Sequence, residues 1–140
     1  MVNVFDVTDF GAIPDGKTDS TKAIQKALDE AGKVKGQVVI PPGKYSCGQI
    51  KVPESVTVEG THGWGYRDIG GTTLILNDEN ATCLIDLTAA FGSMIKGLQL
   101  VGEHKGENVH GFYLKWDLYN GNGAQFFDGY TTDFHEDSFV

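Results

Sequence analysis

The sequence predicts an all-β solenoid that is closed at its N-terminal end by one α-helix. One amphipathic helical segment lies early in the chain, and after Gly36 the pattern changes to short apolar runs separated by turn residues. Corresponding runs recur roughly 35 to 39 residues apart, which is typical of stacked coils with three short strands each. A β-sandwich is the alternative, since short strands and glycine turns suit that fold too.

The segment before Gly36 predicts one strand, one loop and the helix. Residues 2–7 alternate between apolar and polar side chains, as a strand does. Residues 11–16 hold glycine, proline and an Asp-Gly pair, which predict a loop. Asp19 is the expected N-cap of the helix, because its carboxylate can accept hydrogen bonds from backbone N–H groups, and Gly32 is the expected end. One helical face carries the apolar residues Ala23, Ile24, Ala27, Leu28 and Ala31.

The apolar runs after the helix fall into groups of three. The first group is residues 38–40, 50–52 and 56–59, the second is residues 74–76, 84–87 and 95–100, and residues 112–114 begin a third. A loop insertion at residues 61–71 accounts for the uneven spacing. The helix is expected to cover the open end of this stack and to shield its apolar residues and strand edges from water.

Size and composition restrict the class of protein. A chain of 140 residues with 40% hydrophobic residues fits one domain with a sizeable core. The net charge of −8 argues against nucleic acid as a partner, because that binding needs clustered Lys and Arg. No apolar stretch approaches the roughly 20 residues that span a bilayer, so no membrane partner is expected. Cys47 and Cys83 are expected to be buried free thiols, with a disulfide between them as the alternative.

The opening motif resembles a known superfamily. The motif consists of Asp9-Phe10-Gly11-Ala12, Asp15-Gly16, Asp19, and then Pro41-Pro42-Gly43 with Tyr45. It is similar to the N-terminal portion of pectate-lyase-like and polygalacturonase-like proteins. The resemblance implies a right-handed parallel β-helix with an N-terminal capping α-helix and about two to three coils. It also implies that Asp9, Asp15 and Asp19 build the fold and take no part in a reaction.

Two regions are expected along the chain. Residues 1–118 would form the cap and first coils of a β-helix domain, and residues 119–140 an irregular tail, because the apolar runs stop there. A bare last coil would expose core and strand edges to water. The aromatic residues of the tail would therefore fold over that end as an improvised C-terminal cap, or the chain is a truncated piece of a longer protein. Truncation is the expectation, since members with this opening usually carry many more coils.

Two clusters in the sequence are candidates for saccharide contact. The candidate ligand-binding residues are Trp64, Tyr66, Arg67, Tyr113, Trp116 and Asp117. Exposed aromatic rings can stack on sugar faces, and Arg67 can bind a carboxylate through two hydrogen bonds. If Phe112 and Leu114 point into the core, strand alternation directs Tyr113 outward. The structural alternatives are an ordinary packed turn for the first cluster and a lateral packing surface for the second.

No catalytic residue can be carried over from the resembled superfamily. Its hydrolases use paired aspartates in Asn-Thr-Asp and Asp-Asp motifs, with Gly-His-Gly and Arg-x-Lys, and this chain contains none of these motifs. Its lyases need calcium and a basic residue, and no arginine or lysine follows Lys115. The four histidines show no metal-ligand spacing. We therefore assign no catalytic residue, no metal and no cofactor from the sequence.

The resemblance implies a function for a longer parent protein. That parent would be a glycoside hydrolase or polysaccharide lyase, and this chain its N-terminal part; whether the chain is itself an enzyme stays open. A non-enzymatic saccharide-binding or phage-tailspike-like assembly module is the alternative. The expected partner is a polysaccharide, with self-association through the open end or flank of the β-helix. The chain shows no signal peptide, and the resembled proteins are often extracellular or virion-associated, so no location is assigned.

Overall fold

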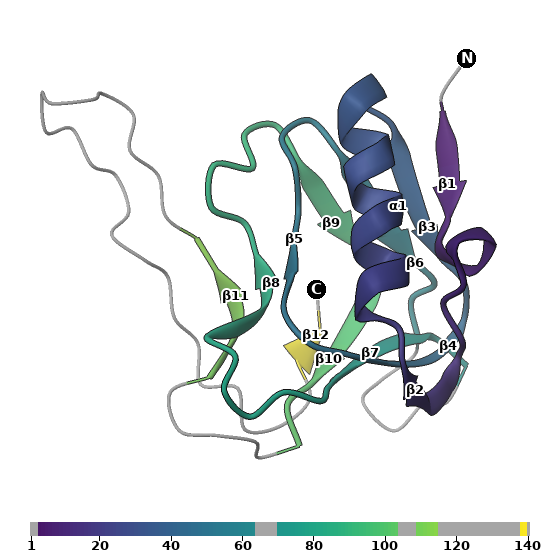
Figure 1. Ribbon diagram of the computed structural model, residues 1–140, viewed down its shortest axis with the longest axis vertical. Coiled ribbons are helices and arrows are strands. Elements are labelled where there is room, and N and C mark those ends of the chain that lie inside the picture. Colours follow the sequence, from purple (N-terminus) through teal and green to yellow (C-terminus); the bar gives the residue numbers. More distant parts are fainter. Residues whose placement is uncertain (1–2, 64–69, 104–108, 115–137, 140) are drawn as a thin grey trace, which may run out of the picture.

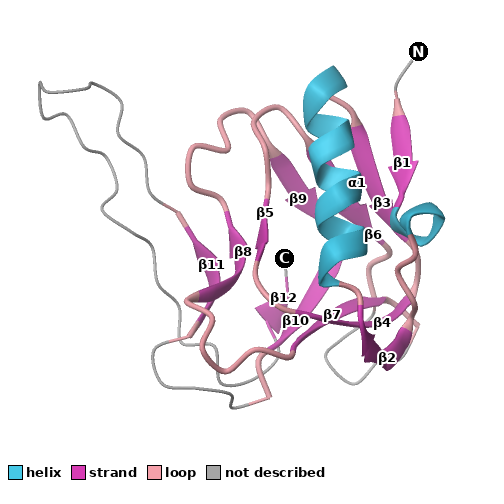
Figure 2. Cartoon of the chain, in the orientation of Figure 1, coloured by secondary structure: helices cyan, strands magenta, loops and turns pink. Residues whose placement is uncertain are grey.

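The structure, a computed structural model, describes residues 3–63, 70–103, 109–114 and 138–139. These residues form one α-helix, one short 3₁₀ helix and twelve strands (Figures 1 and 2). The elements are β1 (Val4–Asp6), η1 (Val7–Phe10), β2 (Asp15–Asp19), α1 (Thr21–Val34), β3 (Gln37–Ile40), β4 (Gly43–Cys47), β5 (Ile50–Lys51), β6 (Thr57–Gly60), β7 (Thr72–Leu76), β8 (Cys83–Asp86), β9 (Met94–Lys96), β10 (Leu98–Val101), β11 (His110–Tyr113) and β12 (Ser138–Phe139).

The strands form three sheets, and each coil of the chain gives one strand to each sheet. Sheet A has the order β1-β3-β6-β9, sheet B the order β12-β10-β7-β4-β2, and sheet C the order β11-β8-β5. Every pairing among β1 to β11 is parallel. The hairpins and Greek keys of a sandwich would pair strands in antiparallel fashion. The predicted solenoid is therefore confirmed, with the three coils β3-β4-β5, β6-β7-β8 and β9-β10-β11, and the β-sandwich alternative is wrong.

The predicted repeat is partly out of phase with the observed one. Residues 38–40 lie in sheet A and pair with β6, whereas residues 74–76 lie in sheet B and pair with β4. The apolar pattern does not reveal β4, because Lys44 and Ser46 alternate with its apolar residues. The predicted run 95–100 contains two strands, β9 and β10, which Gly97 with φ of 73° divides between sheets A and B.

Apolar columns inside the stack form the core. Three columns are Val38, Val58 and Ile95 in sheet A, Tyr45, Leu74 and Leu100 in sheet B, and Ile50, Ile85 and Phe112 in sheet C. All are buried except Ile95 and Phe112, which pack against the core while partly exposed. Burial of each large apolar side chain contributes about 1.5–3 kcal/mol. The repeated apolar positions therefore hold successive coils together.

Helix α1 closes the N-terminal end of the stack, as the sequence predicts. Its buried face consists of Ile24, Ala27, Leu28 and Ala31. The helix contacts η1, β1, β3 and β5, and Figure 1 shows it lying across the end of the stack beside β1 and β3. Within the described ranges, no helix is long and apolar enough to cross a membrane.

The two ends of α1 differ from the sequence prediction. Ser20, and not Asp19, occupies the N-cap position; Asp19 ends β2, and its carboxylate still accepts the first backbone N–H of the helix at 3.1 Å. Gly32 lies inside the helix, where a Cβ would come within 2.9 Å of Pro53. This glycine therefore permits close packing. The helix instead ends at Val34, and its C-cap residue Lys35 has a left-handed φ of 52°.

The segment before the helix is also more regular than predicted. The strand ends at Asp6, because the chain turns into the 3₁₀ helix η1, whose C-cap Gly11 has a φ of 99°. The predicted loop 11–16 is shorter in the structure, because β2 begins at Asp15. This strand pairs with β4 in sheet B.

Candidate functional site

The outer face of sheet C carries a column of three polar side chains, one from each coil. The register aligns Lys51 with Asp86 and Asp86 with Tyr113. The preceding residue of each strand lies in the core column of this sheet, so strand alternation directs these three side chains outward. Lys51 is exposed, and Asp86 and Tyr113 are half-buried. Two inter-strand spacings separate the ends of this column, about 10 Å, which we call the sheet C column.

Backbone contacts hold the sheet C column in place. The backbone of Lys51 is clamped to α1, since its N–H donates to Gln25 Oε1 at 2.8 Å and its carbonyl accepts from Gln25 Nε2 at 3.0 Å. The Asp86 carboxylate accepts the backbone N–H of Thr88 at 2.9 Å, which orients it. The carbonyl of Tyr113 accepts the N–H of Leu87 at 2.7 Å. The column therefore stands on rigid sheet and not on a loop.

The chemistry of the sheet C column suits binding. The Lys51 ammonium can pair with a carboxylate, the Asp86 carboxylate can accept a hydroxyl hydrogen bond, and the Tyr113 ring offers an apolar face with a polar edge. Hydrolysis of a glycosidic bond needs two carboxyl groups flanking that bond, and this column holds one. Among the described residues, no group of three or more His, Cys, Asp or Glu side chains is placed to hold a metal ion.

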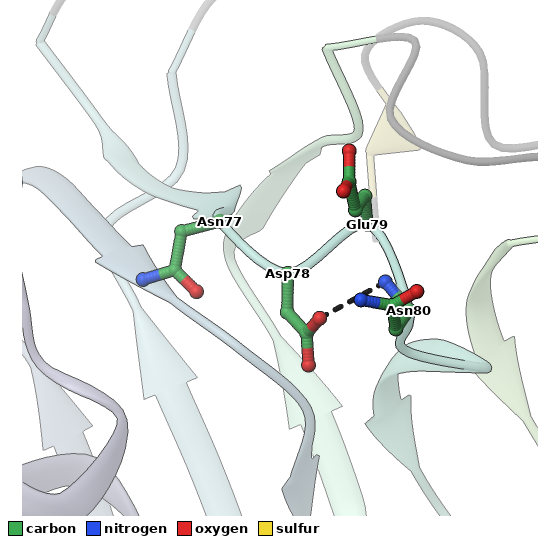
Figure 3. A pocket seen from close by; sticks show the side chains of 4 residues that line it. All are labelled: Asn77, Asp78, Glu79 and Asn80. Atoms are coloured by element: carbon green, nitrogen blue, oxygen red, sulfur yellow. Dashed lines mark hydrogen bonds between the residues drawn. The ribbon is translucent and has the colours of Figure 1, made fainter.

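A hollow in the surface lies at the turn between β7 and β8. It has a volume of about 410 Å³ and is lined by Asn77, Asp78, Glu79 and Asn80. Figure 3 shows Asp78 turned toward Asn80 and Glu79 pointing to the other side of the turn. The Asp78 carboxylate accepts the backbone N–H of Asn80 at 2.9 Å. This hydrogen bond is typical of an Asx turn, so the local geometry is that of a stabilised turn.

Polar contacts beneath this turn join the cap to the first two coils. Asn77 donates to Asp19 and to Ser46, both at 3.1 Å. The Thr21 hydroxyl accepts the N–H of Gly48 at 2.7 Å. Hydrogen bonds from Thr21, and secondarily from Asn77, hold the pKa of Asp19 below its ordinary value. Asp19 therefore has the structural role that the sequence predicts.

Asp15 of the opening motif is structural as well. Asp15 accepts the hydroxyl of Thr18 at 2.6 Å and the backbone N–H groups of Lys17 and Thr18 at 2.8 and 2.7 Å. These hydrogen bonds lower its pKa to about 2. Both cysteines are free and buried, and burial raises the pKa of each thiol to about 12. The predicted free thiols are confirmed, and the alternative disulfide is wrong.

The structure places one of the six candidate saccharide-binding residues. Tyr113 lies on β11 and faces outward, beside the inward Phe112, as strand alternation predicts. The other candidates, which lie outside the described residues, are Trp64, Tyr66, Arg67, Trp116 and Asp117. Sequence reasoning did not include Lys51 and Asp86. Each follows an inward isoleucine, and the predicted repeat aligns these two isoleucines correctly. Applying the same alignment to the next residue of each strand would have identified both side chains.

Comparison with known proteins places the chain in a family. The family model described as "Rhamnogalacturonase A/epimerase, pectate lyase-like" matches residues 4–82, which is more than half of the chain. The chain belongs to this pectate-lyase-like family, and the resemblance of its opening motif is confirmed. The matched segment includes the cap, the first coil and β6 and β7 of the second.

Individual relatives match shorter parts of the chain. An exopolygalacturonase of Zea mays is 37% identical over 89 residues, which cover 54% of this chain and 22% of the relative. Alginate lyase 7 of Azotobacter vinelandii is 55% identical over 42 residues, covering 29% of this chain and 5% of the relative. The putative phage-related protein YobO of Bacillus subtilis is 46% identical over 54 residues, covering 39% and 6%. The chain thus spans less than a quarter of the length of these relatives.

Solved structures share the fold. The A-module of the mannuronan C-5 epimerase AlgE4 from Azotobacter vinelandii superposes with a TM-score of 0.62 at 24% identity, covering 86% of this chain and 35% of that chain. ORF18 of Geobacillus virus E2 superposes with a TM-score of 0.61 at 21% identity, covering 78% and 22%. With its parallel sheets and capping helix, the chain therefore has the short right-handed parallel β-helix fold that the sequence predicts.

Proposed function

We propose that this chain forms the N-terminal cap and first coils of a polysaccharide-processing protein, binds saccharide on the outer face of sheet C, and supplies no catalytic residue itself. The observation that carries this proposal is the sheet C column in a chain of the pectate-lyase-like family. Tyr113 would stack on a sugar ring, Lys51 would pair with a carboxylate, and Asp86 would accept a sugar hydroxyl.

The names of the relatives support an acidic polysaccharide as the ligand class. The exopolygalacturonase and the alginate lyase are named for polymers of uronic acids, each unit of which carries one carboxylate. The chain has a net charge of −8, so a polyanion needs a local cation at its binding site. Lys51 provides such a cation at the end of the sheet C column nearest α1. The relatives' names differ in reaction type, so hydrolysis and elimination remain alternatives for the parent protein.

Calorimetric titration with uronate oligosaccharides tests the binding part of the proposal. We expect Tyr113→Ala to weaken binding of oligogalacturonate or oligomannuronate about tenfold, which corresponds to about 1.4 kcal/mol. Phe91→Ala is the matched control, because Phe91 is a surface aromatic residue that is 37% exposed and lies in the turn between sheets C and A. Equal binding by the two variants would show that the sheet C column is not the contact.

Product assays test the absence of catalysis. The chain is incubated with polygalacturonate and with alginate, and new reducing ends and unsaturated ends are measured. We expect neither to appear above the level of a buffer blank. Sustained release of either product would overturn the proposal that this chain supplies no catalytic residue.

A non-enzymatic assembly module is the second candidate function. The match to the phage-related protein YobO favours it, since that match is 46% identical over 54 residues. Native mass spectrometry distinguishes it from the first candidate, because a phage-type module is expected to form a defined oligomer. A strict monomer that binds no saccharide would count against both candidates.

A further inference from the structure

Sheet C begins, on the side of α1, with a very short strand. β5 consists of Ile50 and Lys51 alone, and among the described residues no further strand lies beyond it in this sheet. On its other side the chain is paired with β8, since the backbone N–H of Val52 donates to the carbonyl oxygen of Asp86 at 3.0 Å. An edge strand leaves its outward backbone N–H and C=O groups unpaired unless another element bonds them.

The side chain of Gln25 occupies the place of the next strand. Its amide oxygen accepts the backbone N–H of Lys51 at 2.8 Å, and its amide nitrogen donates to the carbonyl oxygen of Lys51 at 3.0 Å. A directly opposed residue of an antiparallel strand would form the same two hydrogen bonds. Helix α1 therefore completes the edge of sheet C through one side chain.

Asp29 fixes the orientation of this amide. It lies one helical turn after Gln25, and its carboxylate accepts a second hydrogen bond from Gln25 Nε2 at 2.9 Å. An ionised carboxylate accepts hydrogen bonds but donates none. The nitrogen of the amide must therefore face Asp29 and the Lys51 carbonyl, which leaves the amide oxygen facing the Lys51 N–H.

We propose that Gln25 is a positioning residue, which holds Lys51 in register with Asp86 and thereby gives the sheet C column a preference for acidic over neutral saccharides. This inference rests on the proposed saccharide binding at that column. Of the three members of the column only Lys51 is a cation, so recognition of a carboxylate depends on its placement. The lysine stem has many rotatable bonds, and a fixed backbone lowers the entropic cost of placing its charge.

The rest of the column does not depend on Gln25. The Asp86 carboxylate is oriented by the backbone N–H of Thr88, and the Tyr113 carbonyl is bonded to the N–H of Leu87. Loss of the Gln25 amide should therefore impair recognition of a carboxylate and leave the contacts of a sugar with Asp86 and Tyr113 in place.

Substitution of Gln25 in the full chain tests this role. Gln25→Leu removes both hydrogen-bonding groups and keeps a good helix former of similar size. The matched control is Gln37→Leu, because Gln37 is also half-buried and its side chain donates to Glu59 in sheet A. Lys51→Gln removes the cation itself. Calorimetric titration with trigalacturonate and with its neutral methyl ester gives the ratio of the two affinities, and amide hydrogen exchange at Lys51 reports whether the clamp has opened.

The wild type and Gln37→Leu should prefer the acid about fivefold, within the range of an exposed ion pair. Lys51→Gln should abolish this preference. Gln25→Leu should lower it to about twofold, with an unchanged affinity for the methyl ester and about tenfold faster exchange at Lys51. A merely structural role would weaken the binding of both ligands together.

The outcomes distinguish the role of Gln25 from the proposed site itself. Equal affinity of the wild type for the two ligands would overturn the uronate site on sheet C, and this inference with it. A preference that is lost in Lys51→Gln but stays fivefold in Gln25→Leu would overturn the role of Gln25 alone. Unchanged exchange at Lys51 in Gln25→Leu, or an equal loss of affinity for both ligands, would do the same.

Discussion

Tyr45 is the residue with the least favourable polar environment in the described part of the chain. Its side chain is fully buried in the core column of sheet B, and its hydroxyl finds no hydrogen-bond partner among the described residues. Burial, and then the charge of Asp6, raise the pKa of this phenol. A buried hydroxyl without a partner loses its hydration and gains nothing in return. The buried aromatic ring of Tyr45 therefore stabilises the folded chain, whereas its unpaired hydroxyl destabilises it.

Removal of this hydroxyl should stabilise the protein. We expect Tyr45→Phe to raise the free energy of unfolding by about 1–3 kcal/mol, because the ring stays and the unsatisfied group goes. Urea denaturation measures the change. Tyr113→Phe is the control, since its half-exposed ring lies outside the core and should change stability by less than about 0.5 kcal/mol. A loss of stability in Tyr45→Phe would reveal a partner for the hydroxyl.

Asp15 makes the stability of the folded chain depend on pH in acid. Hydrogen bonds lower its pKa in the folded state from 3.8 to about 2. The stabilisation by this carboxylate is therefore fully present above pH 3.8 and is lost as the pH falls toward about 2. Urea midpoints measured across this window should fall less steeply in Asp15→Asn than in the wild type. A slope in Asp15→Asn equal to that of the wild type would contradict this role of the Asp15 carboxylate.

At the residue scale, the sequence predicts roles from local chemistry. The turn at Asp15 and the helix contact of Asp19 need only neighbours along the chain, so their structural roles are predictable. The unsatisfied hydroxyl of Tyr45 depends on what lies across the core, which no local pattern contains. The same limit applies to Lys51 and Asp86, which only the register of separate coils brings together.

At the scale of elements, the turn between β9 and β10 depends on two glycines in contact. Gly97 has φ of 73°, and a Cβ on it would clash with the carbonyl oxygen of Gly60 in the coil below. The stacked turns of successive coils thus approach backbone to backbone. Gly92 has a similar φ of 70°, but the nearest atom to a Cβ there is Ser55 Oγ at 3.6 Å. Comparing Gly92 with Gly97 therefore distinguishes the free-energy cost of a left-handed backbone angle from the cost of a steric clash between two coils.

Alanine substitutions at these glycines should differ in effect. We expect Gly92→Ala to lose about 1–2 kcal/mol of stability from left-handed backbone strain alone. Gly97→Ala should lose a further 1–3 kcal/mol or so, because the backbone of two coils must also move apart. Chemical denaturation of both variants measures the difference. Equal losses would mean that the coils can separate at this turn without cost.

The elements themselves were predictable where their pattern is long and less so where it is short. The apolar face of α1 repeats over several turns, and the structure confirms it. The bend at Gly97 lies within a continuous apolar run, so the sequence suggests one strand where the structure has two. In the sequence Gly32 suggests the end of the helix. In the structure it lies inside α1, where the lack of a side chain allows close packing against Pro53.

At the scale of the whole molecule, the fold accounts for the position of the candidate site. Parallel stacking places the residue after each inward isoleucine or phenylalanine on the same outer face, so residues from three coils form one column. The superfamily resemblance rests on the opening motif, which is local, and the comparisons bear it out. The sheet C column, in contrast, depends on residues that lie far apart in the sequence. Of the six candidates proposed from the sequence, five lie outside the described residues.

The most direct test of saccharide binding on sheet C is an NMR titration of the nitrogen-15-labelled full chain with oligogalacturonate. The amide shifts of each residue report where the ligand lies, and a neutral malto-oligosaccharide serves as the control. We expect saturable shift changes at Lys51, Asp86 and Tyr113, with none from the neutral sugar. Shift changes confined to the outer faces of sheets A and B, or none at all, would contradict the proposed saccharide site.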